Sequence, residues 1–190
     1  MKTKGHHTCL YNGDRESVLR NSPFLAEYKP KEGKMQFLGT GYYFWDNNLE
    51  LAKVWGKHHY NGKYAVIEVD FDLKSDSCYD LVGNRSHQID LAERLNKLSV
   101  NSGSNKTKKW TLSQFFTFIR KFAVSNRDIF PYEMIRAIDL LNHKKYEKVH
   151  ELILFTEDKD NYTVINPKIV ICVFDKNRLN LQTKRIVFTS

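Results

Sequence analysis

Four consecutive aromatic residues, Tyr42, Tyr43, Phe44 and Trp45, follow a Gly-x-Gly turn and limit how this chain can fold. In a β-strand, successive side chains point to opposite faces of the sheet. Tyr43 and Trp45 would therefore share one face, and Tyr42 and Phe44 the other. The run predicts a short strand in which one aromatic pair fills a core. The second pair either fills a core as well or lines a cleft.

The segments on either side of this strand favour a pocket. Gly39 and Gly41 let the backbone pass close to a ligand or take a positive φ, and aromatic rings beside such a turn offer flat faces to a planar ligand. Asn48 is one of three N-cap candidates for a helix over residues 48–58. Trp55 falls on the apolar face of that helix and is expected to pack back towards the strand.

The whole chain has the length and composition of one α+β domain, residues 1–190. Apolar and polar patterns predict helices at residues 15–21, 48–58, 86–100, 112–124 and 131–144. Strands are predicted at residues 4–11, 42–45, 64–73, 150–157, 166–175 and 184–190. The helices within residues 86–144 interrupt the strands and are expected to form a helical insertion or lid.

Net charge and cysteine content indicate which partners and which cellular compartment to expect. The net charge of +8 and the pI near 9.3 favour phosphate-rich or anionic partners without identifying one. Cys9, Cys78 and Cys172 are odd in number and show no CxxC pair, which indicates a reducing compartment. No apolar run approaches the ~18 residues of a membrane span, and the basic start has no signal core. A cytoplasmic location without membrane contact is therefore expected, unless a dedicated system exports the protein.

Several separated motifs together resemble a known family. A first strand contains a histidine, a Gly-x-Gly-Tyr-Tyr-Phe run leads into a helix with Ala and Trp, and a late strand ends in Val-Phe-Asp. This arrangement is similar to the ADP-ribosyltransferase superfamily, in the branch of diphtheria toxin and the poly(ADP-ribose) polymerases, and to uncharacterised bacterial domains assigned to it. The resemblance covers residues 5–73 and 149–180. It implies a split β-sheet, NAD as the substrate and transfer of ADP-ribose to a protein or nucleic-acid acceptor, as in bacterial toxins or defence effectors.

The resemblance also implies roles for individual residues. His7 stands where the family's histidine contacts the adenosine ribose, and Tyr43 where a tyrosine stacks on nicotinamide. Thr8 replaces the usual glycine whose backbone meets the nicotinamide amide. Gly41 and Trp55 complete the expected NAD-binding set.

The catalytic acid is the position at which this chain departs from the family motif of histidine, tyrosine and glutamate. A carboxylate suits NAD cleavage because it stabilises the positive charge that develops on the ribose. On the last matching strand, however, the glutamate position is occupied by Val170. The nearest acids are Glu157, Asp158 and Asp160, in the turn that leads into the strand. Glu157 is therefore the candidate acid, and the alternative is that this acidic turn is only solvated.

Three other functions remain open. If the acid is missing, the chain would be a catalytically impaired module that binds NAD or ADP-ribose. A basic nucleic-acid binder would use the linker of residues 101–109 with the neighbouring aromatics Trp110, Phe115, Phe116 and Phe118, although these phenylalanines also fit the core face of a helix. A Cys9 nucleophile has His7 nearby but no further partner.

A metal site is not predicted. The histidines and the cysteine that could be considered as zinc ligands show neither CxxC nor HxxxH spacing. They are His6, His7, Cys9, His58 and His59.

Overall fold

The computed structural model describes the chain except for residues 35, 75, 102–109, 140–151, 155–161 and 165, and its fold is α+β, as expected. The strands are β1 (Lys2–Leu10), β2 (Tyr42–Asp46), β3 (Tyr64–Asp72), β4 (Cys78–Asp80), β5 (Met134–Ile138), β6 (Leu152–Leu154), β7 (Tyr162–Val164), β8 (Ile169–Val173) and β9 (Arg185–Thr189). The α-helices are α1 (Arg15–Asn21), α2 (Leu49–His59), α3 (Arg85–Asn101) and α4 (Leu112–Ser125). Short 3₁₀ turns occur at Pro30–Glu32, Arg127–Ile129, Lys176–Arg178 and Leu181–Thr183.

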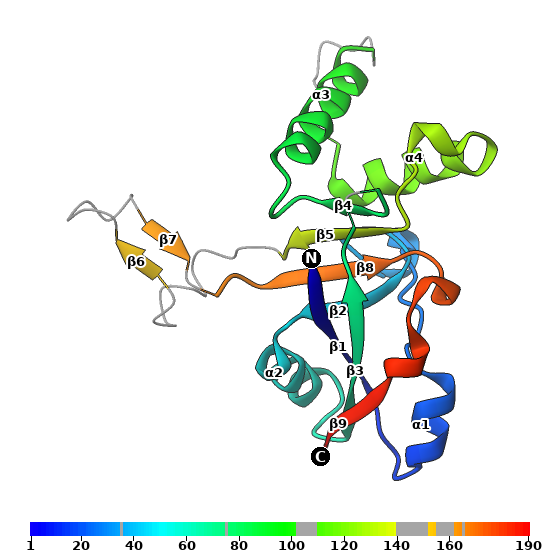
Figure 1. Ribbon diagram of the computed structural model, residues 1–190, viewed down its shortest axis with the longest axis vertical. Coiled ribbons are helices and arrows are strands. Elements are labelled where there is room, and N and C mark those ends of the chain that lie inside the picture. Colours follow the sequence, from blue (N-terminus) through cyan, green and yellow to red (C-terminus); the bar gives the residue numbers. More distant parts are fainter. Residues whose placement is uncertain (35, 75, 102–109, 140–151, 155–161, 165) are drawn as a thin grey trace.

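Seven of these strands form one mixed sheet in the order β4-β5-β8-β2-β1-β3-β9, and β6 pairs with β7 in a second, two-stranded sheet. β1 pairs with β3 over its whole length but with β2 only at Gly5↔Asp46 and His6↔Trp45. In Figure 1, β5 and β8 run close to horizontally, whereas β1 and β3 run close to vertically. The sheet is thus continuous, but its two parts diverge beyond His6.

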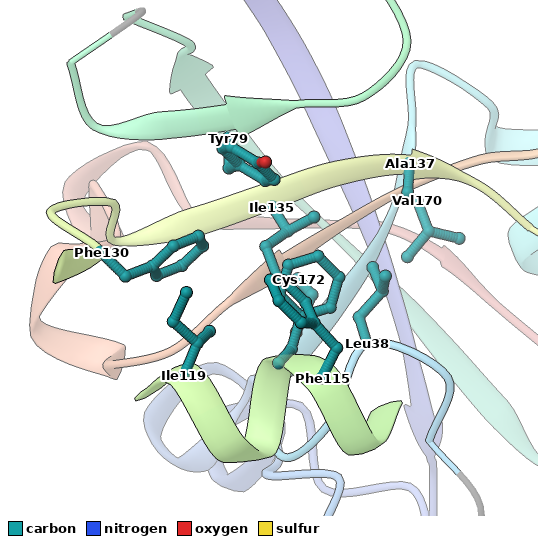
Figure 2. Close-up of a cluster of buried hydrophobic side chains, with 10 residues drawn as sticks. Leu38, Tyr79, Phe115, Ile119, Phe130, Ile135, Ala137, Val170 and Cys172 are labelled. Atoms are coloured by element: carbon teal, nitrogen blue, oxygen red, sulfur yellow. The ribbon is translucent and has the colours of Figure 1, made fainter. Parts of the chain in front are cut away.

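The main hydrophobic core lies between α4 and the sheet. Figure 2 shows Phe115 and Ile119 of α4 pointing at the strands that carry Ile135 and Cys172. Phe116 is also fully buried, so Phe115 and Phe116 belong to the core, as one interpretation of the sequence held. Thr111 caps α4 by accepting a hydrogen bond from the backbone N–H of the third helical residue, which fixes where the helix begins.

Most predicted elements are confirmed. The aromatic run forms β2, and Asn48 caps α2 by accepting from the Leu51 N–H at 2.9 Å. The strand predicted over residues 166–175 is β8, which lies between β5 and β2. α1, α3 and α4 also lie where the sequence predicts them.

The predicted helix over residues 131–144 is wrong in its described part. Met134–Ile138 is strand β5, with β4 on one side and β8 on the other. An apolar run this short fits helix and strand almost equally well, so its neighbours decide. Here β4 and β8 form hydrogen bonds with the backbone of Met134–Ile138 on both sides. In addition, Arg136 forms ion pairs with Asp46 at 2.7 Å and with Asp80 at 3.2 Å. In its described part, the expected helical insertion therefore contains the helices α3 and α4 and the strand β5 of the main sheet. Residues 102–109 and 140–144 lie outside that part.

Candidate functional site

A cavity of about 400 Å³ opens where β1 and β2 diverge. This volume falls within the range of small-molecule pockets, ~300–1,000 Å³. β1, β2, the loop after α1 and the end of α2 supply most of its wall. The described lining residues are His6, His7, Thr8, Phe24, Leu25, Ala26, Gln36, Phe37, Tyr43, Phe44, Trp45, Trp55, Tyr60, Asp139 and Val170. Four of the five predicted NAD-binding residues are therefore brought together: His7, Thr8, Tyr43 and Trp55.

His7 bridges the two strands beside the cavity. Its Nδ1 lies 2.8 Å from the Tyr43 carbonyl, and its Nε2 accepts from the Phe24 N–H at 3.2 Å. These partners require Nδ1 to carry the proton of a neutral ring. Burial lowers the pKa of His7 to about 4, against the opposing effect of the Tyr43 carbonyl. Both ring nitrogens are thus committed within the protein.

His6 differs from its neighbour in having an unsatisfied ring nitrogen. Its Nε2 lies 3.0 Å from Glu68 Oε2, and Glu68 also pairs with Lys4 at 3.2 Å and with Arg185. The His6 Nδ1 is buried and has no hydrogen-bond partner in the part of the chain that the structure describes. Leaving such a group unpaired costs ~1–3 kcal/mol, which a ligand could recover. When Nε2 donates to Glu68, a neutral His6 offers an acceptor at Nδ1, which suits a ligand hydroxyl.

Tyr43 contributes its ring rather than its hydroxyl. The hydroxyl donates to the Gly39 carbonyl at 2.6 Å and accepts from the Leu38 N–H at 3.2 Å. These bonds hold the turn in which Gly39 has φ +83°, a conformation that favours glycine. Burial raises the pKa of the Tyr43 phenol, so it stays protonated. Its fixed ring forms one flat part of the cavity wall, beside Phe37 at a centroid distance of 6.3 Å.

Trp55 and Thr8 join β1 and α2 at the cavity. The Trp55 ring stacks on His59 at a centroid distance of 4.1 Å and meets the edge of Tyr60 at 5.5 Å. Thr8 is buried, and its hydroxyl donates to the Ala52 carbonyl of α2 at 2.8 Å. The Thr8 side chain therefore lines the cavity while its hydroxyl is held by the helix.

Gly41 is not among the described lining residues. It forms a β-bridge with Ala26, and a Cβ at this position would lie 2.8 Å from the Val173 carbonyl and still nearer the Cys172 sulfur. Glycine is needed here because β8 passes so close. In this structure its position is explained by packing and not by a ligand.

The carboxylate of the site comes from an unexpected element. Val170, where the resemblance puts the acid, lines the cavity and is 4% exposed. Glu157, the predicted acid, lies outside the described residues, as do Asp158 and Asp160. Asp139, directly after β5, lines the cavity instead. Sequence analysis missed it because residues 131–144 read as a helix. His6 was given no ligand-binding role, because the resemblance puts the family's histidine at His7.

The structure adds little support for a Cys9 nucleophile or for nucleic-acid binding by the aromatics near residue 110. Cys9 is buried, and burial raises the pKa of its thiol to about 11, which disfavours the reactive thiolate. Among the proposed nucleic-acid-binding aromatics, Phe118 is 37% exposed and contacts Trp110 and Phe122, at centroid distances of 5.2 and 4.7 Å. The linker that would accompany them, residues 102–109, lies outside the described part.

The described residues contain neither a candidate metal cluster nor a membrane-crossing helix. In that part of the chain, no group of three or more His, Cys, Asp or Glu side chains could hold a metal ion. None of its helices combines the length and apolarity needed to cross a membrane. Comparison with protein-family models, curated proteins and solved structures found no match to the chain.

Proposed function

We propose that this chain is an NAD-dependent ADP-ribosyltransferase that modifies a macromolecular target. One observation carries the proposal: a cavity with aromatic walls is lined by a buried histidine whose Nδ1 has no hydrogen-bond partner among the described residues. Flat walls suit the nicotinamide ring, and an acceptor nitrogen suits a ribose hydroxyl. The divergence of β1 from β2 is also in keeping with the split sheet of that family.

His6, rather than His7, takes the ligand-binding role in this proposal. The two ring nitrogens of His7 bind Tyr43 and Phe24, so His7 serves to hold the strands apart and in register. The His6 ring lines the cavity, its buried Nδ1 lacks a hydrogen-bond partner among the described residues, and Glu68, 3.0 Å from its Nε2, fixes the orientation of the ring. An orienting partner of this kind reduces the cost of ordering a ligand-binding group.

The cavity fits the nicotinamide and ribose half of NAD better than the whole dinucleotide. No Lys or Arg is found among its described lining residues, so the diphosphate would lie outside it. In the reaction, the C1′–N1 bond breaks and its electron pair leaves with nicotinamide. A nucleophilic group of the acceptor then bonds to C1′ of the oxocarbenium ion and releases a proton. The enclosed walls would limit the competing attack of water.

A catalytically impaired NAD-binding module is the second candidate, and Val170 favours it. A buried valine on the cavity wall of β8 cannot stabilise a cation as a carboxylate does. In that case the chain would bind NAD or ADP-ribose without turnover.

The experiment is to measure NAD binding and nicotinamide release by the wild type and four variants. His6→Ala removes the unpaired nitrogen, Tyr43→Ala removes a flat wall, and Glu157→Gln removes the acid predicted from the sequence. His58→Ala is the matched control, because His58 is exposed on α2 outside the cavity. We expect binding to fall at least tenfold for His6→Ala and Tyr43→Ala and to be unchanged for His58→Ala.

The outcomes separate the candidates. Release of nicotinamide by the wild type supports the transferase, and binding without release supports the impaired module. If the wild type neither binds nor cleaves NAD, both are refuted. Equal NAD affinity in the wild type and the folded His6→Ala variant would refute the role given to His6.

A further inference from the structure

A second cavity, of about 390 Å³, lies between the end of α4 and residues 174–178, which follow β8. Its volume falls within the range of small-molecule pockets. Three arginines line it, Arg120, Arg127 and Arg178, together with the half-buried rings of Tyr132 and Phe174. Among the described residues, none lines both this cavity and the first one, so the two cavities are separate.

Two of these arginines converge on one carboxylate oxygen. Arg127 Nη2 lies 2.7 Å and Arg178 Nη1 lies 3.2 Å from Glu133 Oε1. One carboxylate balances only one of the two charges. The arginine side chains are 62% and 46% exposed, and each guanidinium has five N–H donors. An incoming oxyanion can therefore reach donors that Glu133 leaves unused.

The third arginine, Arg120, is held in place by the protein. It donates to the Thr40 carbonyl at 2.6 Å, and its guanidinium carbon lies 3.9 Å from the centroid of the Phe174 ring. No Asp or Glu in the described part of the chain forms an ion pair with it. Because its guanidinium is already ordered, it loses little conformational freedom when a ligand binds.

Charge and flat surfaces together point to one class of ligand. The described side chains of the cavity carry three positive charges against the negative charges of Glu133 and Asp175. The fork of a guanidinium matches the oxygens of a phosphate group, and bases stack on aromatic rings and on guanidinium planes alike. A nucleotide combines a phosphate with a planar base. The net charge of +8 also favours phosphate-rich partners.

We infer that this second cavity binds a nucleotide, free or within a single strand of nucleic acid. Arg127 and Arg178 hold the phosphate, and the base lies against Tyr132 and the Arg120–Phe174 pair. The inference goes beyond the proposed function and does not depend on it. It also differs from the nucleic-acid surface expected from the sequence, because none of the aromatics named for that surface lines this cavity.

The test titrates adenosine 5′-monophosphate, adenosine and phosphotyrosine into the isotope-labelled full chain, and NMR follows the signals of residues 174–178. Arg127→Gln and Arg178→Gln each remove one positive charge from the cavity. Lys121→Gln is the matched control, because Lys121 is exposed on α4 outside the cavity. Glu133→Gln removes the neighbouring carboxylate, and its control is Glu16→Gln, whose site is exposed on α1.

We expect the wild type to bind the nucleotide at least tenfold more tightly than adenosine or phosphotyrosine. Each arginine variant should lose about tenfold in affinity for the nucleotide, as expected for a lost charge-assisted hydrogen bond. Glu133→Gln should bind the nucleotide about threefold more tightly, because a carboxylate beside the phosphate repels it. Both control variants should bind the nucleotide as the wild type does.

Nucleotide affinity that is unchanged in both arginine variants, or that falls equally in Lys121→Gln, would overturn the inference. So would adenosine bound as tightly as the nucleotide, or a Glu133→Gln variant without tighter binding. Phosphotyrosine bound as tightly as the nucleotide would overturn it in favour of a phosphopeptide. A single-stranded oligonucleotide separates the two sources: tighter binding than the mononucleotide indicates nucleic acid, equal binding indicates the free nucleotide, and the inference stands in both cases.

Failure of the proposed function is recognised separately in the nicotinamide-release assay. If the wild type cleaves NAD but nucleotide binding does not depend on the two arginines, the inference fails and the transferase stands. If nucleotide binding depends on Arg127 and Arg178 but NAD is not cleaved, the inference stands and the transferase fails.

Discussion

Acidification should destabilise this protein through His7 before most carboxylates titrate. Burial lowers the pKa of His7 from 6.5 to about 4. Between pH 6.5 and about pH 4, His7 binds a proton in the unfolded chain but not in the folded chain. The free energy of unfolding therefore falls as the pH falls. Integrated from about pH 7.5 to about pH 4.5, the loss is about 2.5 kcal/mol from this residue alone. Below about pH 4 the folded state is protonated as well, and the loss from His7 stops increasing.

The measurement is urea unfolding across this pH range for the wild type, His7→Gln and the control His58→Gln. His7→Gln should be less stable near neutral pH, because it disturbs the bonds to Tyr43 and Phe24, but its stability should depend less on pH by about 2.5 kcal/mol. His58 is exposed, so His58→Gln should follow the wild type. Comparing variants cancels the other titrating groups, which all three proteins share.

Parallel pH profiles for the wild type and His7→Gln would refute this reasoning. Such a result would mean that the His7 ring accepts a proton in the folded state as easily as in the unfolded state. The ring would then not be held neutral by its bonds to Tyr43 and Phe24, and the structural role given to His7 would fail.

Three further predictions concern the frame of the site. Gly41→Ala should destabilise the fold by ~1–3 kcal/mol in thermal or urea unfolding, because its Cβ would meet the Val173 carbonyl at 2.8 Å; unchanged stability would contradict this packing. Arg136→Ala should cost ~3–5 kcal/mol, because it leaves the buried Asp46 carboxylate without its partner at 2.7 Å; a double variant with Asp46→Ala should recover part of the loss. Thr111→Ala should cost ~0.5–2 kcal/mol through loss of the α4 cap, whereas Thr111→Ser should cost little.

Capping residues and alternating apolar side chains correctly predicted the helices and strands in which these patterns are strong. The helix predicted at residues 15–21 is α1, which Asp14 caps by accepting from the Ser17 N–H, and the alternating residues of 64–73 form β3 as predicted. The same signals failed for Met134–Ile138, because an apolar run of five residues does not distinguish the two periodicities. Because strand β5 was not predicted, the position of Asp139 in the cavity wall was not predicted either.

The sequence by itself determined that an aromatic strand, a histidine strand and a capped helix would be present. It determined this because turns, caps and alternating side chains act over a few residues. Only the tertiary structure decided which histidine keeps an unpaired nitrogen and which carboxylate reaches the cavity. Those properties depend on strand register between distant segments: β1 leaves β2 after His6, and β5 joins β8 so that Asp139 shares its face with Val170. A shift of one residue in either register would turn these side chains to the opposite face.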